Sequence, residues 1–254
     1  MGVDAQQRKL VMAGGLEVVA VPAFADNYLW LVHDHDSGET AVVDPGDGDA
    51  VLGAAAARGW TIDQVWNTHW HPDHTGGNAR VVEATGAALS APAAEAGRIP
   101  GIDHPLSEGA TVTLGDHVGE VWEVPGHTLG HVALVFRDDG IAFVGDTIFA
   151  MGCGRLFEGT PDQMFTSLQR LAKLPPETSL YPAHEYTLSN ARFAAAAEPA
   201  NEAIANRLRL TQQQREAGEM TLPTTVREER ATNPFVRAAD AGTFAVLRAW
   251  KDSY

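Results

Sequence analysis

Residues 68–77 read THWHPDHTGG, and this stretch places three histidines and one aspartate within six positions. A chain of this composition contains the pattern His-x-His-x-Asp-His by chance about once in a thousand cases. The run Gln64–Thr68 predicts a strand before the stretch, and Asn78–Thr85 predicts a helix after it. The sequence therefore predicts a strand-to-helix loop that is rich in metal ligands.

The spacing inside this loop predicts how its side chains divide between ions. Side chains two positions apart in an extended chain point to the same side, so we expect His69 and His71 to bind one metal ion together. Pro72 then ends the strand, and Asp73 and His74 can turn toward a neighbouring ion. Zinc-like ions take about four ligands each, so the rest of the chain must supply more.

Three further candidate ligands follow other predicted strands. His127 lies in PGHT, Asp146 in VGDT and His184 in YPAHE, each after an apolar run. Sites in open α/β sheets gather beyond the carboxyl ends of the strands, which favours a shared location for all these residues. A carboxylate has two oxygens, so Asp146 could bridge two ions.

Apolar runs and helical patterns alternate over the first 185 residues, which predicts a layered α/β domain. From about Tyr186 onward the strand signal stops, and we place a domain boundary there: residues 1–185 form a catalytic domain and residues 186–254 a helical domain. Predicted strands are Leu16–Val21, Tyr28–His33, Thr40–Val43, Gln64–Thr68, Thr111–Leu114, Val118–Val124, Val132–Arg137, Ile141–Val144 and Ser179–Tyr181. Predicted helices are Asp49–Arg58, Asn78–Thr85, Pro161–Lys173, Leu188–Ala197, Ala200–Ala217 and Ala241–Trp250.

The composition limits the class of protein. The 254 residues are 44% hydrophobic and 20% charged, and no apolar run approaches the roughly 18 residues that span a bilayer, so we expect a globular protein without a membrane partner. The N-terminal segment MGVDAQQRKLVMAGG lacks the apolar stretch that drives secretion, which predicts a cytoplasmic location. The single cysteine, Cys153, cannot form an internal disulfide, which fits a reducing compartment.

The net charge of −15 is unevenly distributed. Residues 1–186 carry −16 and residues 187–254 carry +1. A chain this acidic repels phosphate backbones unless a basic stripe intervenes, and the sequence contains none, so nucleic acid is excluded as an expected partner.

Seven motifs are spread over nearly the whole chain. They are THWHPDHTGGN (68–78), PGHTLGH (125–131), VGDTIF (144–149), GCGRLFEGT (152–160), AHEYT (183–187), NPF (233–235) and LRAWKD (247–252). Together they resemble the motifs of the metallo-β-lactamase superfamily and, within it, of the hydroxyacylglutathione hydrolase (glyoxalase II) family. The resemblance implies a four-layer αβ/βα sandwich with a C-terminal helical domain, and hydrolysis of the thioester S-D-lactoylglutathione to D-lactate and glutathione.

The resemblance also implies the ligand sets and the cofactor. It implies two divalent metal ions, with zinc as the first choice and iron or manganese as the other candidates. It also implies Asp73 and Asp146 as catalytic residues. One ion is expected on His69, His71 and His127, and the other on Asp73, His74 and His184, with Asp146 and a hydroxide bridging them. Metal-bound water with a pKa near about 7 supplies hydroxide at neutral pH, so no serine or cysteine nucleophile is needed.

The family's substrate-binding elements match Arg155, Tyr186, Arg248 and Lys251. Arg248 and Lys251 lie three positions apart on a predicted helix, a spacing that also suits an ordinary solvated face. Animal-type relatives carry Lys where Arg155 stands and Tyr where Phe157 stands, so a hydroxyl is missing here.

Alternative functions remain open at this stage. A single-iron glutathione persulfide dioxygenase generally lacks the long C-terminal helical region, and a β-lactamase uses cysteine where this chain has Asp146. An RNA-processing nuclease needs a basic surface. A non-catalytic metal-stabilised binding protein should have lost ligands, and all seven are present.

The remaining chemistry-bearing residues are expected to play minor parts. His131 is expected to support a ligand, and Cys153 to be a small residue in a tight loop. The other four histidines are expected at the surface; they are His33, His35, His104 and His117.

Overall fold

The predicted strand at residue 64 is β5 (Gln64–Trp66), and it lies inside a seven-stranded sheet with the strand order β1 to β7. The structure is a computed structural model that describes residues 11–13 and 15–254. The N-terminal segment behind the cytoplasmic prediction therefore falls largely outside the described residues. By their internal contacts, the described residues form two compact units.

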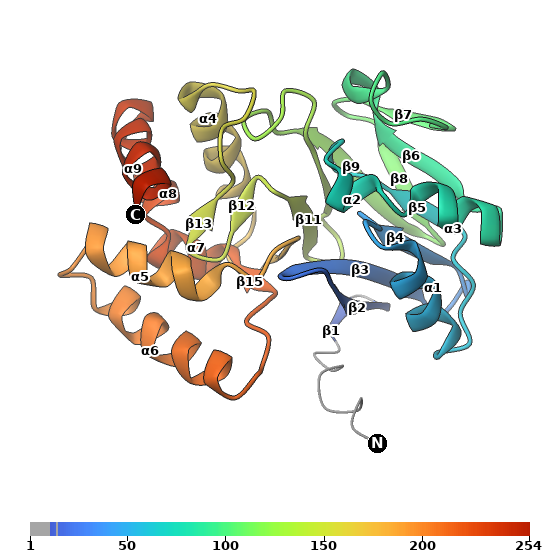
Figure 1. The fold of residues 1–254 in the computed structure, drawn as a ribbon, viewed down its shortest axis with the longest axis horizontal. Helices are drawn as coiled ribbons and strands as arrows, with labels where there is room; N and C mark the ends of the chain where they lie inside the picture. The colour runs from blue at the N-terminus through green and yellow to red at the C-terminus, as the bar shows by residue number, and fades with distance from the viewer. Residues whose placement is uncertain (1–10, 14) are drawn as a thin grey trace. The chain divides into compact units, whose positions relative to one another are not determined.

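The first unit runs to Glu123 and includes Gly130–Gly145. Strands β1 to β4 of its larger sheet pair antiparallel, and β4 to β7 pair parallel. Figure 1 shows these strands with α1 and α3 beside them. The strands are β1 (Val11–Ala13), β2 (Leu16–Ala23), β3 (Asn27–Asp34), β4 (Thr40–Val43), β5, β6 (Ala88–Pro92) and β7 (His104–Leu106), and the helices are α1 (Gly48–Ala56), α2 (Pro72–Thr75), α3 (Asn78–Thr85) and the 3-10 turn η1 (Ala93–Glu95).

Burial of apolar strands and capping of helix ends account for the elements of the larger sheet and its helices. The strands β3 and β4 are buried along their whole length, as expected of central strands, and they consist largely of aromatic and aliphatic residues in β3 and of β-branched residues in β4. Asp47 caps α1 by accepting a hydrogen bond from the Ala50 amide at 3.0 Å. The helix α3 ends at Gly86, whose φ of +75° is left-handed.

A second, antiparallel set of strands completes the first unit. Its order is β8 (Thr111–Leu114), β9 (His117–Glu123), β10 (Val132–Phe136) and β11 (Ile141–Gly145). The ring of Phe136 on β10 stacks on Trp66 of β5 at 5.7 Å, and both side chains are fully buried. The two sets of strands therefore share one apolar core.

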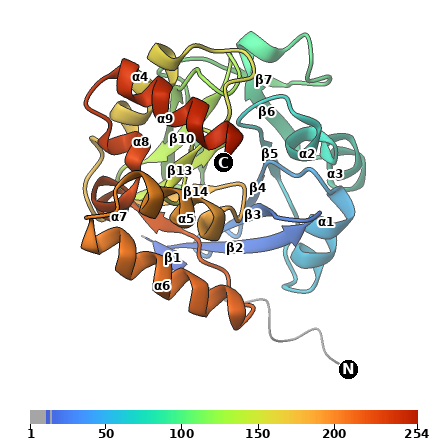
Figure 2. The same ribbon diagram turned by 60° about the vertical axis from the view of Figure 1, so that its left-hand side comes forward.

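The second unit comprises residues 124–129 and 146–254 and is mainly helical. Its helices α5 and α6 lie side by side in Figures 1 and 2, and the stacked rings of Phe193 and Phe235 form part of its core. Its elements are β12 (Ile148–Phe149), β13 (Gly152–Cys153), α4 (Pro161–Leu171), β14 (Ser179–Pro182), α5 (Thr187–Ala197), α6 (Glu202–Glu216), β15 (Thr224–Thr225), α7 (Val226–Thr232), α8 (Pro234–Arg237) and α9 (Ala241–Ser253).

Each predicted strand and helix is present, with ends shifted by a few residues. The prediction of no strand after residue 186 was wrong at one point, because the two residues of β15 pair with β14. Strands β6 and β7 were not predicted, since ALSAP and HPL carry proline and few β-branched residues. Within the described ranges, no helix is long and apolar enough to cross a membrane.

Candidate metal centre

The loop after β5 is held by a carboxylate that the sequence analysis did not single out. Asp44 follows β4 and accepts hydrogen bonds from the Thr68 amide at 2.8 Å, from the Thr68 hydroxyl at 2.7 Å and from His74 Nδ1 at 3.0 Å. Asp44 is buried and has a φ of +52°, a conformation that only fixed surroundings maintain in a non-glycine residue. Its position directly after an apolar strand is the same signal that selected Asp146.

These bonds set the tautomers of two histidines. Because His74 donates from Nδ1 to Asp44, its Nε2 carries the lone pair, and this atom lies 3.4 Å from an oxygen of Asp73. The Thr68 hydroxyl gives its proton to Asp44, so it accepts from His69 Nδ1 at 3.1 Å and leaves His69 Nε2 as a ligand atom.

The expected pair His69 and His71 meets as the spacing predicted. His69 Nε2 lies 3.0 Å from His71 Nδ1, and the ring of the fully buried His131 stacks on His69 at 4.6 Å. Asp73 is oriented by Asn27, whose amide donates to its carboxylate at 3.0 Å. Four expected ligands are thus brought together in the first unit.

The second unit assembles the other three expected ligands. His127 donates from Nδ1 to the Arg155 carbonyl at 2.8 Å, which leaves its Nε2 facing Asp146 Oδ2 at 3.4 Å. His184 Nε2 lies 3.4 Å from the other oxygen, Oδ1, of the same carboxylate. All three side chains are buried, and Asp146 thus presents one oxygen to each histidine.

The spacing of these atoms fits divalent metal ions. Two nitrogen or oxygen ligands at about 2.0–2.2 Å from a tetrahedral ion are about 3.3–3.6 Å apart. The pairs His74–Asp73, His127–Asp146 and His184–Asp146 are each separated by 3.4 Å, which is long for a hydrogen bond. The site offers carboxylates and buried imidazoles, and in His74 and His127 a hydrogen bond at Nδ1 leaves Nε2 available as the ligand atom. Such a donor set suits zinc, iron or manganese.

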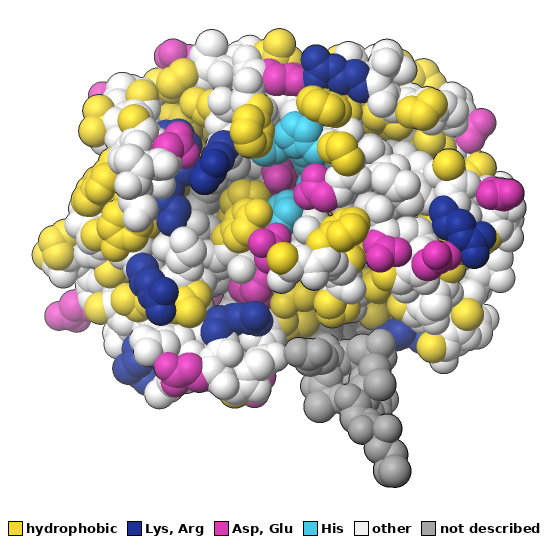
Figure 3. All heavy atoms as spheres, in the orientation of Figure 1, with side chains coloured by type: hydrophobic (Ala, Val, Ile, Leu, Met, Phe, Trp, Pro, Cys, Tyr) yellow, Lys and Arg dark blue, Asp and Glu magenta, His cyan; other side chains and the backbone are white. Residues whose placement is uncertain are grey.

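A cationic cluster occupies the end of α9. Lys251 donates to the Ser189 hydroxyl at 3.0 Å on α5, and Arg248 donates to the Cys153 carbonyl at 2.9 Å and to Asp252 at 2.9 Å. Arg155 Nε lies 3.9 Å from the same Asp252 carboxylate. Figure 3 shows lysine and arginine side chains on the surface near α5 and α9. Arg248 is buried, so the alternative of a solvated helix face is wrong for this residue.

Burial and the neighbouring cations lower the pKa of Lys251. Burial is the larger cause, and Arg248 and Arg155 add to it. An anion bound here would stabilise the protonated ammonium, which makes the cluster a candidate site for carboxylates.

Tyr186 and Phe157 flank the ligands of the second unit. The Tyr186 ring stacks on His184 at 4.8 Å with an interplanar angle of 2°, and the Phe157 ring meets His127 edge to face at 5.2 Å. Phe157 is 63% exposed.

Burial raises the pKa of the Cys153 thiol to about 11. The residue lies in β13 beside Arg248, whose charge only partly offsets the burial. A thiol with such a pKa is protonated at neutral pH and therefore a poor nucleophile.

Two histidines expected at the surface are not there. His33 is buried, shares a hydrogen bond of 2.9 Å with Thr40 and stacks on Trp60 at 4.2 Å. His117 is half-buried and contacts Asp139 at 2.7 Å. The sequence pattern around these two histidines does not reveal which residues they contact in the fold. His35 and His104 are exposed, as expected.

Comparison with known proteins adds two family matches that together cover most of the chain. Residues 26–184 match the family model described as "Metallo-beta-lactamase superfamily", and residues 185–254 match "Hydroxyacylglutathione hydrolase C-terminus". The hydroxyacylglutathione hydrolase of Erythrobacter litoralis is 51% identical over 251 residues, covering 94% of this chain and 100% of that protein. That of Maricaulis maris is 48% identical, covering 92% of this chain and 96% of its own.

Solved structures show the same fold. ETHE1 from Myxococcus xanthus aligns with a TM-score of 0.68 at 24% identity and covers 88% of this chain and 85% of that one. The di-iron-bound form of TTHA1623 aligns with a TM-score of 0.61 at 26% identity, covering 89% of this chain and 100% of that one. The expected fold, with its additional C-terminal domain, is thereby confirmed.

Proposed function

We propose that this chain, which belongs to the metallo-β-lactamase superfamily and, within it, to the hydroxyacylglutathione hydrolase family, cleaves S-D-lactoylglutathione to D-lactate and glutathione. It is a metal-dependent hydrolase. The observation that carries the proposal is the ligand spacing of 3.4 Å repeated at three His–Asp pairs, in a chain whose C-terminal residues 185–254 match the hydrolase family.

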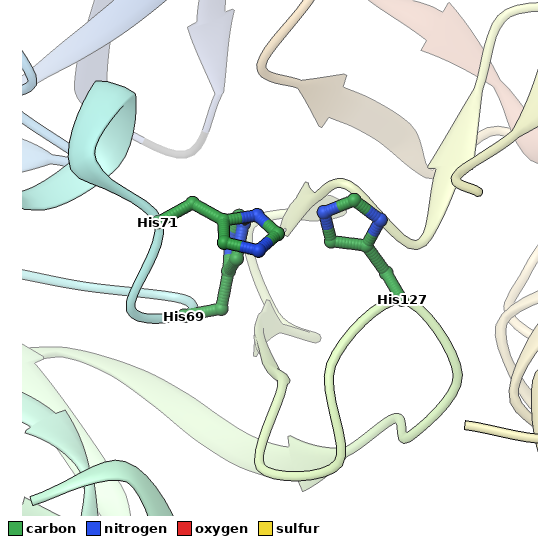
Figure 4. A group of neighbouring side chains, drawn as sticks. All are labelled: His69, His71 and His127. Atoms are coloured by element: carbon green, nitrogen blue, oxygen red, sulfur yellow. Dashed lines mark hydrogen bonds between the residues drawn. The ribbon is translucent and has the colours of Figure 1, made fainter. Parts of the chain in front are cut away.

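We assign one divalent ion to His69, His71 and His127, and a second to Asp73, His74 and His184, with Asp146 bridging. This division into two triads follows the family motifs, and the contacts within each unit support it: His69 lies against His71, Asp73 against His74, and His184 against Asp146. Figure 4 draws the first triad, with His69 and His71 from the loop after β5 and His127 from the loop after β9. Zinc is the metal we favour, because the set contains five imidazoles and two carboxylates.

When bound, the two ions supply a hydroxide at neutral pH and polarise the carbonyl of the thioester. The residues of the chain provide the rest. Asp44 and the Arg155 carbonyl keep the proton on Nδ1 of His74 and His127, so that Nε2 stays available as a ligand. The leaving thiolate needs no strong general acid, and the protonated Cys153 takes no part.

Residues 186–254 form the substrate-binding domain in this proposal. The glutathione moiety carries two carboxylates, and the cationic cluster of Arg155, Arg248 and Lys251 provides charge to receive one of them. Tyr186 is the N-cap of α5, the helix whose Ser189 contacts Lys251, and its ring stacks on His184.

The C-terminal match favours the hydrolase over the two main alternatives. The family model over residues 185–254 covers the helical region that the single-iron dioxygenases generally lack. A non-catalytic binding protein has no need of all seven ligands, three of which are histidines whose tautomers are fixed by hydrogen bonds.

A panel of D-lactoyl thioesters that differ only in the thiol tests the substrate. We expect hydrolysis of the glutathione thioester with a kcat/KM at least about a hundredfold above those of coenzyme A and N-acetylcysteamine thioesters. Equal rates on all three would reject glutathione recognition, and no hydrolysis of any thioester by metal-loaded protein would reject the activity.

Elemental analysis tests the metal assignment separately. We expect close to two ions per chain, and we expect Asp146→Asn to lose metal and at least about a hundredfold in kcat. Full activity with a stable single ion would contradict the binuclear assignment.

A further inference from the structure

The hairpin of β12 and β13 connects two of the proposed ligands. Asp146 lies two residues before β12, and Arg155, whose carbonyl holds His127, lies two residues after β13. The packing at the base of the hairpin is close, since a Cβ at Gly154 would lie 2.0 Å from the Asp146 carbonyl and 3.1 Å from His127 Nδ1. A shift of this hairpin would therefore move both Asp146 and the support of His127.

The tip of the hairpin is held by side chains from the C-terminal helices. Asn233 Nδ2 donates to the Gly152 carbonyl at 2.9 Å and to the Phe149 carbonyl at 3.3 Å. Asn190 Nδ2 on α5 donates to the Ala150 carbonyl at 3.1 Å. These side-chain amides donate to carbonyl groups at the tip of the hairpin that need hydrogen-bond partners outside the two short strands.

A buried carboxylate fixes the remaining tip residue. The carboxylate of Glu229 on α7 accepts a hydrogen bond from the backbone N–H of Met151 at 2.8 Å and another from the side-chain Nδ2 of Asn233 at 2.8 Å. Met151 has a left-handed φ of +60°. Arg207 on α6 neutralises Glu229 at 2.8 Å, which makes the burial of this carboxylate tolerable. Side chains from α5, from α7 and from the N-cap of α8 thus contact one hairpin of two-residue strands, and α6 acts on it through Glu229.

We propose that Asn233, Glu229 and Asn190, here called the hairpin clamp, are positioning residues that hold Asp146 and the His127 support in register for metal binding. The inference rests on the proposed metal centre. It assigns the C-terminal segment a part in the metal site, separate from substrate binding.

The substitution Asn233→Asp isolates the clamp. Asn233 also caps α8 by accepting the Phe235 amide at 3.0 Å, and an aspartate keeps this cap and the side-chain size. It loses both donors to the hairpin and places a second carboxylate beside Glu229. The matched control is Asn201→Asp, which keeps the cap of α6 and loses donors only to Glu198 and the Ala231 carbonyl.

Three measurements follow each variant. In metal-free protein, we expect hydrogen exchange of residues 146–155 to accelerate about tenfold or more in Asn233→Asp and to stay unchanged in Asn201→Asp. Competition with a chromophoric chelator should show Zn²⁺ affinity reduced about 10- to 100-fold, and kcat should fall at least about tenfold while KM changes less than about threefold.

Wild-type exchange and Zn²⁺ affinity in Asn233→Asp would overturn the proposal, as would equal losses in Asn201→Asp. If Asn233→Asp does not fold, Asn190→Asp removes a single bond, and unchanged hairpin exchange in that variant overturns the proposal as well. Exchange and chelator competition need no thioester, so these results stay distinct from a failure of the proposed hydrolase activity.

Discussion

The carboxylate of Asp44 accepts a hydrogen bond from Nδ1 of His74 at 3.0 Å, although the two residues lie 30 positions apart. The same carboxylate accepts two hydrogen bonds from Thr68, so one buried group orders the start and the end of the ligand loop. The metal-binding face of the first unit therefore depends on a residue that binds no metal in our assignment.

We expect Asp44→Asn to reduce metal affinity about 10- to 100-fold, because an amide cannot accept all three of these hydrogen bonds and its NH₂ opposes the His74 donor. Chelator competition measures this loss. Asp49→Asn is the matched control. Asp49 is exposed, and its side chain forms a salt bridge with the exposed Arg80, away from the ligand loop. Wild-type metal affinity in Asp44→Asn would show that the His74 tautomer is set elsewhere.

Lys251→Met should raise KM for the glutathione thioester about ten- to a hundredfold and leave kcat largely unchanged. A hydrogen bond between charged groups contributes about 1.5–3 kcal/mol, and a contact far from the reacting carbonyl holds ground state and transition state alike. Steady-state kinetics check both parameters, with the exposed Lys173→Met as the control.

The lowered pKa of Lys251 adds a pH dependence to this contact. Deprotonation begins below the usual lysine value of 10.5, so the KM of the unmodified enzyme should rise with pH on the alkaline side. This rise should be absent in Lys251→Met. An identical alkaline profile in both proteins would assign it to another group.

Cys153→Ala should keep kcat within about tenfold of the original, because a covalent nucleophile contributes far more than that. The thiol pKa of about 11 also predicts that native protein at pH 8 resists iodoacetamide, whereas unfolded protein reacts. Mass spectrometry of the alkylated chain distinguishes the two. An acyl group trapped on Cys153 would refute this prediction.

His33 should make the protein less stable in acid. Burial, reinforced by the neighbouring His35, lowers the pKa of His33 below 6.5, so the unfolded chain binds the proton more readily. Stability should therefore fall as pH drops through about 6.5 and level off below the folded pKa. The Tm of His33→Phe, which keeps the ring on Trp60, should vary less between pH 7 and pH 5 than that of the original protein, while exposed His104→Phe should follow the original. Equal slopes in all three would reject the assignment.

The sequence alone selected the candidate ligands, because each candidate follows a predicted strand and the geometry of an extended chain is local. Residues 69 and 71 were expected to meet, and their ring nitrogens lie 3.0 Å apart. Motif resemblance added the function and the likeness of residues 185–254 to the hydrolase family, which the comparisons confirm.

Only the tertiary structure decided which distant group orients each ligand. Periodicity tells which face of an element is buried and gives no partner, so the bonds of Asp44 to His74 and of Asn233 to the hairpin carbonyls were invisible in the sequence. The burial of Arg248 and His33 was hidden for the same reason, since a polar side chain is stable in the interior only when groups on other elements complete its contacts. These groups are the Cys153 carbonyl for Arg248, and Thr40 and Trp60 for His33.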